Sequence, residues 1–123
     1  MNLADSVVDK YGAVLKNLRN NDEERVIDEK TALKIKEMME KTVTDGTATG
    51  AKSHTIAICG KTGSAETGWI KNGQTLVHGW FCGFFPKDNP KYAMAVFCEN
   101  GQSGAQSCVP LFLSLAEKIM LLE

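Results

Sequence analysis

Nothing in the sequence is apolar over the roughly 18 to 20 residues that a helix needs to cross a lipid bilayer. The N-terminus, Met1 to Asp5, also lacks the basic segment followed by an apolar one that marks a signal peptide. The 14 lysines and arginines nearly balance the 15 aspartates and glutamates, which argues against both a nucleic-acid-binding surface and a polyacidic tail. We therefore expect the 123 residues to form one soluble domain.

Metal-binding cysteine patterns are absent as well. The four cysteines are Cys59, Cys82, Cys98 and Cys108. They form no Cys-x-x-Cys pair, and neither histidine lies at a ligand spacing from one of them. Three of them lie in apolar, strand-like runs, where a free thiol behaves as a small hydrophobic side chain. We expect reduced, structural thiols, with a disulfide as the alternative, and neither a metal nor a cofactor.

The first part of the chain predicts a hairpin, a loop and a helix. Residues 6–16 are typical of two short strands around a turn, for which Gly12 supplies a permissive backbone. The polar residues 17–25 predict a solvated loop. A helix is then expected from its N-cap, Asp28, to residues 44–46. Its apolar positions are Ala32, Ile35, Met38 or Met39, and Val43.

The rest of the chain predicts three strands and a second helix. The expected strands are an apolar one at residues 55–58 that leads into Lys61, a second at 76–85 and a third at 92–98. A ten-residue hairpin loop at 66–75 joins the first two, and a proline-containing turn at 86–90 joins the last two. The last helix runs from Cys108 or Pro110 to Leu122, because proline suits a first helical turn. Its expected buried face carries Leu111, Leu115, Ile119 and Leu122.

These elements together predict an α+β fold. Short connections between long consecutive strands favour an antiparallel meander. The expected architecture is therefore an antiparallel sheet of three main strands, with a short N-terminal hairpin and two helices that cover the sheet. No internal repeat or domain boundary is visible in the sequence.

The most unusual stretch is residues 55–65, where an apolar run leads directly into charge. Lys61 stands where a buried strand should continue, and the hydroxyls of Thr62 and Ser64 flank Gly63. An ammonium group and two hydroxyls at the edge of a strand suit an anionic ligand. A phosphate-binding loop is a poor match, because its first glycine would have to stand at Thr55 and no helix is predicted after the lysine.

Lys61-Thr62-Gly63 matches the Lys-Thr-Gly element of penicillin-binding proteins and their β-lactamase relatives. The surrounding sequence extends the match, through residues 46–48, 60–66, 78–86 and 88–96. Nearly the whole chain, most specifically residues 43–113, resembles the transpeptidase domain of high-molecular-mass, class B-like penicillin-binding proteins. Sensor domains for β-lactams and class D β-lactamases share the Lys-Thr-Gly strand but resemble the turn at 84–90 less well.

The resemblance implies a role for each residue of the motif. Lys61 would be the catalytic residue here, supplying positive charge and orienting the proton-transfer network. The hydroxyls of Thr62 and Ser64 would hold the carboxylate of a penicillin or of the peptidoglycan stem peptide. The backbone N–H of Ser64 would complete an oxyanion hole, and Gly63 would leave room for the ligand.

Two motifs of the same family are missing from these residues. No serine is followed three residues later by lysine, and no Ser-x-Asn occurs. We therefore expect residues 1–123 to be a single C-terminal fragment of a D,D-transpeptidase domain, inactive alone. The resemblance implies a parent anchored in the cytoplasmic membrane with this domain outside. The expected partners are the missing N-terminal half of the domain and a second copy of the chain, which would pair through exposed strand edges. The alternative is a β-lactam sensor fragment or a non-catalytic interaction module.

Four other residues near the motif have plainer interpretations. We expect His78 and Trp80 to serve packing or hydrogen bonding, because buried aromatic side chains usually belong to the core. Glu66 is interpreted as a surface carboxylate and not as a general base. Trp69 lies in the predicted loop, and the sequence does not decide whether it contacts a substrate or a partner.

Overall fold

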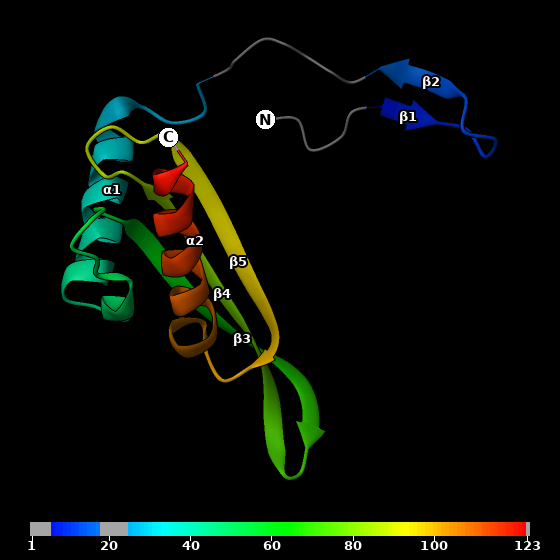
Figure 1. The fold of residues 1–123 in the computed structure, drawn as a ribbon. Coiled ribbons are helices and arrows are strands. Elements are labelled where there is room, and N and C mark those ends of the chain that lie inside the picture. Colours follow the sequence, from blue (N-terminus) through cyan, green and yellow to red (C-terminus); the bar gives the residue numbers. More distant parts are fainter. Residues whose placement is uncertain (1–5, 18–24, 123) are drawn as a thin grey trace.

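The computed structural model describes residues 6–17 and 25–122. A two-stranded sheet pairs β1 (Ser6–Val8) with β2 (Val14–Asn17), and a three-stranded antiparallel sheet has the order β3 (Cys59–Lys71), β4 (Gln74–Phe85), β5 (Tyr92–Gly101). The helical elements are α1 (Glu29–Thr44), η1 (Thr49–Ala51), η2 (Gly104–Cys108) and α2 (Val109–Leu121). In Figure 1, α2 runs along one face of the larger sheet. This arrangement confirms the predicted α+β fold.

Two expectations concern residues that are not described. The predicted signal-free N-terminus and most of the predicted loop at residues 17–25 lie outside the described residues. Among the helices that are described, none combines the length and the apolar character that a membrane crossing requires.

Helix α1 begins where the sequence predicts. The backbone N–H of Thr31 donates to Oδ1 of Asp28 at 2.7 Å, and its hydroxyl donates to Oδ2 at 2.9 Å. These two hydrogen bonds lower the pKa of the Asp28 carboxyl. The predicted apolar face is confirmed only near the C-terminal end of the helix, where Met39 is half-buried and Val43 is buried, whereas Ala32 and Ile35 are exposed. The reason is that, among the described elements, α1 packs chiefly on the edge strand β3 and on η1, so that only part of its apolar face is covered.

The strand that carries the motif starts later than predicted. Residues 55–58 are not in a strand, although Ile56 and Ile58 are buried, and β3 begins at Cys59. The backbone of this irregular segment is engaged elsewhere, because the N–H of Lys87 donates to the carbonyl of Ala57 at 2.9 Å.

The predicted ten-residue hairpin loop is also wrong. β3 continues to Lys71 and β4 begins at Gln74, so that a two-residue turn at Asn72 and Gly73 joins them. Both turn residues have positive φ angles, 53° and 77°, as tight hairpin turns require. A register shift between Glu66 and Ile70, around Gly68 with its φ angle of 76°, accommodates this stretch within the pair of strands.

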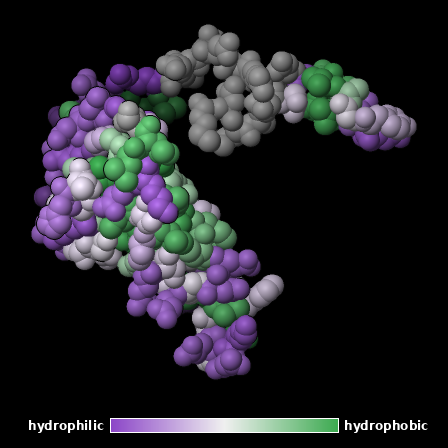
Figure 2. All heavy atoms as spheres, viewed as in Figure 1, coloured by the Kyte–Doolittle hydropathy of each residue, from purple (hydrophilic) through white to green (hydrophobic). Residues whose placement is uncertain are grey.

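The core lies between α2 and the sheet. The rings of Phe81 and Phe85 meet the ring of Phe112 edge to face, with centroids 4.8 and 5.8 Å apart, and all three side chains are fully buried. Val109 and Ala116 complete the buried stripe of the helix. Of the predicted buried face, Ile119 packs against the core, but Leu111, Leu115 and Leu122 are wrong, because they are 51%, 46% and 87% exposed. The helix is apolar nearly all round, and Figure 2 shows apolar side chains gathered over it.

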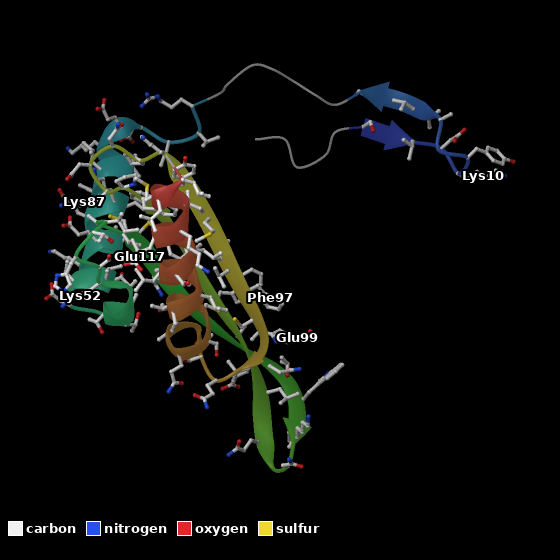
Figure 3. The ribbon with its side chains drawn as sticks, viewed as in Figure 1. Lys10, Lys52, Lys87, Phe97, Glu99 and Glu117 are labelled. Carbon is white, nitrogen blue, oxygen red and sulfur yellow. The ribbon has the colours of Figure 1, made fainter. Side chains whose placement is uncertain are left out.

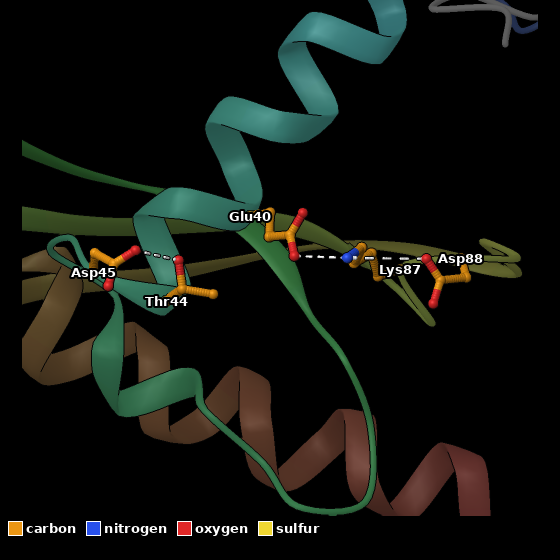
Figure 4. A network of polar contacts seen from close by, with 5 residues as sticks. All are labelled: Glu40, Thr44, Asp45, Lys87 and Asp88. Atoms are coloured by element: carbon orange, nitrogen blue, oxygen red, sulfur yellow. Dashed lines mark hydrogen bonds and ion pairs between the residues drawn. The ribbon is translucent and has the colours of Figure 1, made fainter.

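An ion pair links the predicted proline-containing turn to α1. Nζ of Lys87 donates to Oε1 of Glu40 at 2.6 Å and lies 4.0 Å from a carboxylate oxygen of Asp88 (Figure 4). The hydrogen bond to Glu40 raises the pKa of Lys87. This contact fixes the turn beside the helix that precedes the motif strand.

Candidate functional site

The Lys-Thr-Gly motif lies in the first part of β3, which is an edge strand of the three-stranded sheet. Its strand partner is β4, and residues 61 to 64 stand opposite residues 82 to 79. An edge strand presents backbone N–H and C=O groups that a further extended chain can pair with. The predicted strand edge is therefore present, although the strand around it is longer than expected.

Strand alternation divides the motif between the two faces of the sheet. Thr62 stands opposite Phe81, and Ser64 stands opposite Gly79, so both hydroxyl side chains share the face that α2 and η2 cover. Lys61, opposite Cys82, belongs to the other face. The two predicted carboxylate-binding hydroxyls are thus brought together on one side of the strand, and the predicted catalytic lysine lies on the other.

The hydroxyl of Thr62 is held by a residue from the turn after α1. Its Oγ1 lies 2.7 Å from Oγ1 of Thr47, and either atom can be the donor. The backbone around Thr47 is fixed, since the N–H of Ala48 donates to the carbonyl of Thr42 at 3.0 Å and the Ala48 side chain is fully buried. A side chain at Gly46 would stand 2.9 Å from backbone atoms of Thr42, so only glycine fits there.

The hydroxyl of Ser64 is held from the opposite direction. Its Oγ accepts a hydrogen bond from the backbone N–H of Gly104, the first residue of η2, at 3.1 Å. Gly104 lies directly on the strands, and a Cβ there would collide with the carbonyl oxygens of Gly63 and Trp80. The N–H that meets Ser64 therefore has little freedom to move.

The face that carries Lys61 is open and aromatic. Nζ of Lys61 donates to the carbonyl oxygen of its neighbour Thr62 at 2.5 Å, and the side chain is exposed. The Trp80 and Phe97 rings lie 4.4 Å apart on this face and are 45% and 46% exposed. Figure 3 shows Phe97 projecting from β5 away from α2. A Cβ on Gly63 would approach the Cβ of Trp80 to 3.3 Å, a tight contact within the sheet itself.

The other candidates from the sequence have identifiable places. Nδ1 of His78 accepts the N–H of Asn100 at 3.3 Å, which agrees with a hydrogen-bonding role. Trp80 packs on Phe97, which agrees with the expected packing role. It lies on the open face and not in the core, where a buried aromatic side chain was expected. Glu66 is exposed, as a surface carboxylate should be, and Trp69 is 74% exposed near the tip of the hairpin.

The four cysteines are all free thiols. Cys59 and Cys108 are buried, whereas Cys82 is exposed on the open face. Burial raises the pKa of Cys59, and burial together with a hydrogen bond to Cys98 raises the pKa of Cys108 to about 11. Within the described residues, no three His, Cys, Asp or Glu side chains gather as metal ligands would.

A hollow of about 310 Å³ lies away from the motif, between α1 and the irregular segment before β3. It is lined by Glu40, Lys52, His54 and Lys87 over an apolar floor, and no residue of the motif contributes to it. The motif strand itself is one open wall. Such a wall becomes a cleft only when an opposing surface is present.

Two residues that support the site, Thr47 and Gly104, are not predicted by the sequence. Thr47 was visible only as part of the small-residue segment at 46–48, and its bond to Thr62 joins positions 15 residues apart. Gly104 meets Ser64 across 40 residues, and nothing in the local sequence indicates that contact. A hydroxyl between glycine and alanine, directly after a helix, is the signal that could have indicated Thr47.

Comparisons with known proteins agree with the fold. A family model, the penicillin binding protein transpeptidase domain, matches residues 1–119. Peptidoglycan D,D-transpeptidase MrdA of Acinetobacter baumannii is 37% identical over 93 residues, which cover 65% of this chain and 14% of that protein.

Solved structures are similar as well. The transpeptidase domain of FtsI4 D,D-transpeptidase from Legionella pneumophila has 30% identity and a TM-score of 0.63, covering 76% of this chain and 37% of that one. PBP2 of Pseudomonas aeruginosa, in complex with WCK 5153, has 28% identity and a TM-score of 0.69, covering 89% of this chain and 24% of that one. The chain therefore spans only a small part of each of these relatives.

Proposed function

Since the chain belongs to the penicillin-binding protein transpeptidase family, we propose that β3 forms one wall of the active site of a serine D,D-transpeptidase that cross-links peptidoglycan. The observation that carries this proposal is the pair of hydroxyls, Thr62 and Ser64, on one side of an edge strand next to Lys61. A carboxylate is a strong acceptor for such donors. The parent protein would bind penicillins and the stem peptide at this wall.

Each residue of the motif has a distinct part in the proposal. Thr62 and Ser64 donate to the carboxylate of the ligand, and the edge of β3 pairs with the ligand backbone. The N–H of Ser64 contributes to an oxyanion hole, where one lost donor typically costs about 2.7 to 4 kcal/mol. Lys61 places positive charge near the reacting serine and orients the proton transfer. Gly63 allows the close approach of the ligand.

The nucleophile must come from elsewhere in the parent. Neither Ser-x-x-Lys nor Ser-x-Asn occurs in these 123 residues, and the chain spans 14% of the A. baumannii relative. Positioned donors without a nucleophile have no acyl transfer to accelerate. We propose that residues 1–123 are the C-terminal portion of the domain and that they do not react with penicillin alone.

The surroundings of the domain follow from the same proposal. The rest of the transpeptidase domain is the first partner, because it brings the serine to the wall formed by β3. The family resemblance supports a parent anchored in the cytoplasmic membrane with this domain outside. Open strand edges and the exposed Trp80 and Phe97 favour a second contact, dimerisation of the isolated chain.

A non-catalytic module is the second candidate. A β-lactam sensor fragment or a degenerate interaction domain would keep the Lys-Thr-Gly strand without cross-linking peptidoglycan. The upstream sequence distinguishes the two, because the enzyme requires Ser-x-x-Lys and Ser-x-Asn before this segment. A metalloprotease-like membrane segment upstream would support the sensor.

The test uses a labelled penicillin and intact mass spectrometry on this chain and on its longer parent. We expect one covalent adduct on the parent and none on the chain. Prior treatment of the parent with unlabelled penicillin should abolish the labelled adduct, which controls for non-specific reaction. A stoichiometric serine adduct on the chain alone, or no adduct on the parent, would contradict the proposal.

A further inference from the structure

Both predicted carboxylate-binding hydroxyls are already engaged by the chain itself. Thr62 Oγ1 lies 2.7 Å from the hydroxyl of Thr47, and Ser64 Oγ accepts the N–H of Gly104 at 3.1 Å. We propose that Thr47 and the Gly104 N–H are positioning groups that set the hydroxyls of Thr62 and Ser64 as donors toward a ligand carboxylate. This inference rests on the proposed function of β3.

The hydrogen bonding of Ser64 is the clearer of the two cases. A backbone N–H can only donate, so the bond from Gly104 uses the oxygen of Ser64 and leaves its single hydrogen unused. An ionised carboxylate can only accept. The hydrogen of Ser64 is therefore directed to whatever acceptor lies beyond the strand, and an anionic ligand is the acceptor that suits it best.

The hydrogen bond between the hydroxyls of Thr47 and Thr62 can run in either direction. When the site is empty, either hydroxyl can donate to the other. When a carboxylate accepts from Thr62, the hydrogen of Thr62 is committed to the ligand, and Thr47 must then donate to Thr62. The chain of donors runs from Thr47 through Thr62 to the ligand, and each bond in such a chain polarises the next one.

Thr47 is placed rigidly enough for this role. The turn that carries it is fixed by the Ala48–Thr42 backbone bond and by the buried Ala48 and Ala51 side chains. Steric crowding at Gly46 excludes larger residues before it. Threonine is also restricted at χ1 by its branched Cβ. The hydroxyl thus reaches Thr62 without a large loss of conformational freedom when the ligand binds.

The test compares a labelled penicillin with its methyl ester in the longer parent, by the second-order rate constant of acylation. Thr47→Val keeps the shape of the side chain and removes the hydroxyl. We expect it to lower the rate with the free acid about tenfold and the rate with the ester about twofold or less, because the neutral ester accepts more weakly. Thr47→Ser should restore the wild-type rates within about twofold.

A matched control is Thr49→Val, at an exposed threonine two residues later at the start of η1, which should leave both rates unchanged. A purely structural role of Thr47 would lower the acid and ester rates equally, and that result would overturn the inference. If Thr47→Val does not fold, judged by its circular dichroism spectrum, Thr47→Ala takes its place, and the comparison of its acid and ester rates decides the question in the same way.

Thr62→Val separates this inference from the function on which it rests. A fall in the acid-to-ester ratio in Thr62→Val but not in Thr47→Val would overturn the positioning role and leave the carboxylate site standing. An unchanged ratio in Thr62→Val would remove the carboxylate site itself. The expected result is that the ratio of the acid rate to the ester rate falls in both single variants and falls no further in the double variant Thr47→Val, Thr62→Val.

Discussion

The two faces of the β3-β4-β5 sheet differ in how completely the described chain covers them. Beneath α2, Phe81, Phe85 and Phe112 are fully buried, whereas Trp80 and Phe97 on the opposite face are close to half exposed. The same strands supply both sets of rings, and alternation along each strand assigns neighbouring side chains to opposite faces. One face is a finished core, and the other, although Cys59 at the start of β3 is buried, is an open apolar surface around Trp80 and Phe97.

The motif is divided along this difference. Thr62 and Ser64 share the covered face and have partners from the turn after α1 and from η2. Lys61 belongs to the open face, where its ammonium group hydrogen-bonds the carbonyl of its own neighbour. The hydroxyl half of the candidate site is thus held by other parts of the described chain, whereas the lysine half is exposed on the open face.

Truncation of a ring should cost far more on the covered face than on the open one. We expect Phe112→Ala to lower the free energy of unfolding by about 3 to 5 kcal/mol. Phe97→Ala, which removes the same number of atoms from a half-exposed position, should lower it by only about 1 to 2 kcal/mol. Urea unfolding followed by circular dichroism measures both. Equal losses would mean that the open face is covered in solution, for example by a second copy.

Gly104→Ala tests how tightly η2 is packed on the motif strand. The new methyl group would collide with the carbonyl oxygens of Gly63 and Trp80, so we expect a loss of about 1 to 3 kcal/mol in the free energy of unfolding. Gly50→Ala is the matched control, because a Cβ there meets Val109 at 3.4 Å, an ordinary contact, and should change stability by less than about 0.5 kcal/mol. An unchanged free energy of unfolding in Gly104→Ala would contradict the close packing of η2 on β3.

The thiols on the two faces should respond differently to alkaline pH. Burial and the bond to Cys98 raise the pKa of Cys108 to about 11. The folded state then holds this proton more tightly than the unfolded state does. Its stabilisation is complete below about pH 9, the usual thiol value, and is lost as the pH rises through about 11. Urea midpoints measured from pH 8 to 11 should fall less steeply in Cys108→Ala, while Cys82→Ala, at the exposed thiol, should follow the wild type.

Local signals in the sequence predicted local structure correctly. Asp28 before an amphipathic pattern predicted the start of α1, and Gly12 predicted the first hairpin turn. The errors arose where a pattern fits two answers. Helix α2 is apolar on several sides, so the sequence does not indicate that Phe112, and not Leu115, meets the aromatic rings of β4.

The site was predictable only along one strand. Residues 61 to 64 stand together in the sequence, and their motif identified them. Their supporting groups, Thr47 and Gly104, are far from them in the sequence. Both reach β3 through contacts that depend on the packing of the turn and of η2. That Lys61 and Thr62 lie on opposite faces of the sheet, and which of them shares the face with α2, follows only from the register of β3 on β4.

A crystal structure of the longer parent acylated by a penicillin would test the central claim, that the hydroxyl side of β3 holds the ligand carboxylate. We predict carboxylate oxygens within roughly 2.5 to 3.0 Å of Thr62 Oγ1 and Ser64 Oγ, with Thr47 still bonded to Thr62. A carboxylate that lies on the Trp80 and Phe97 face, or that contacts neither hydroxyl, would contradict it.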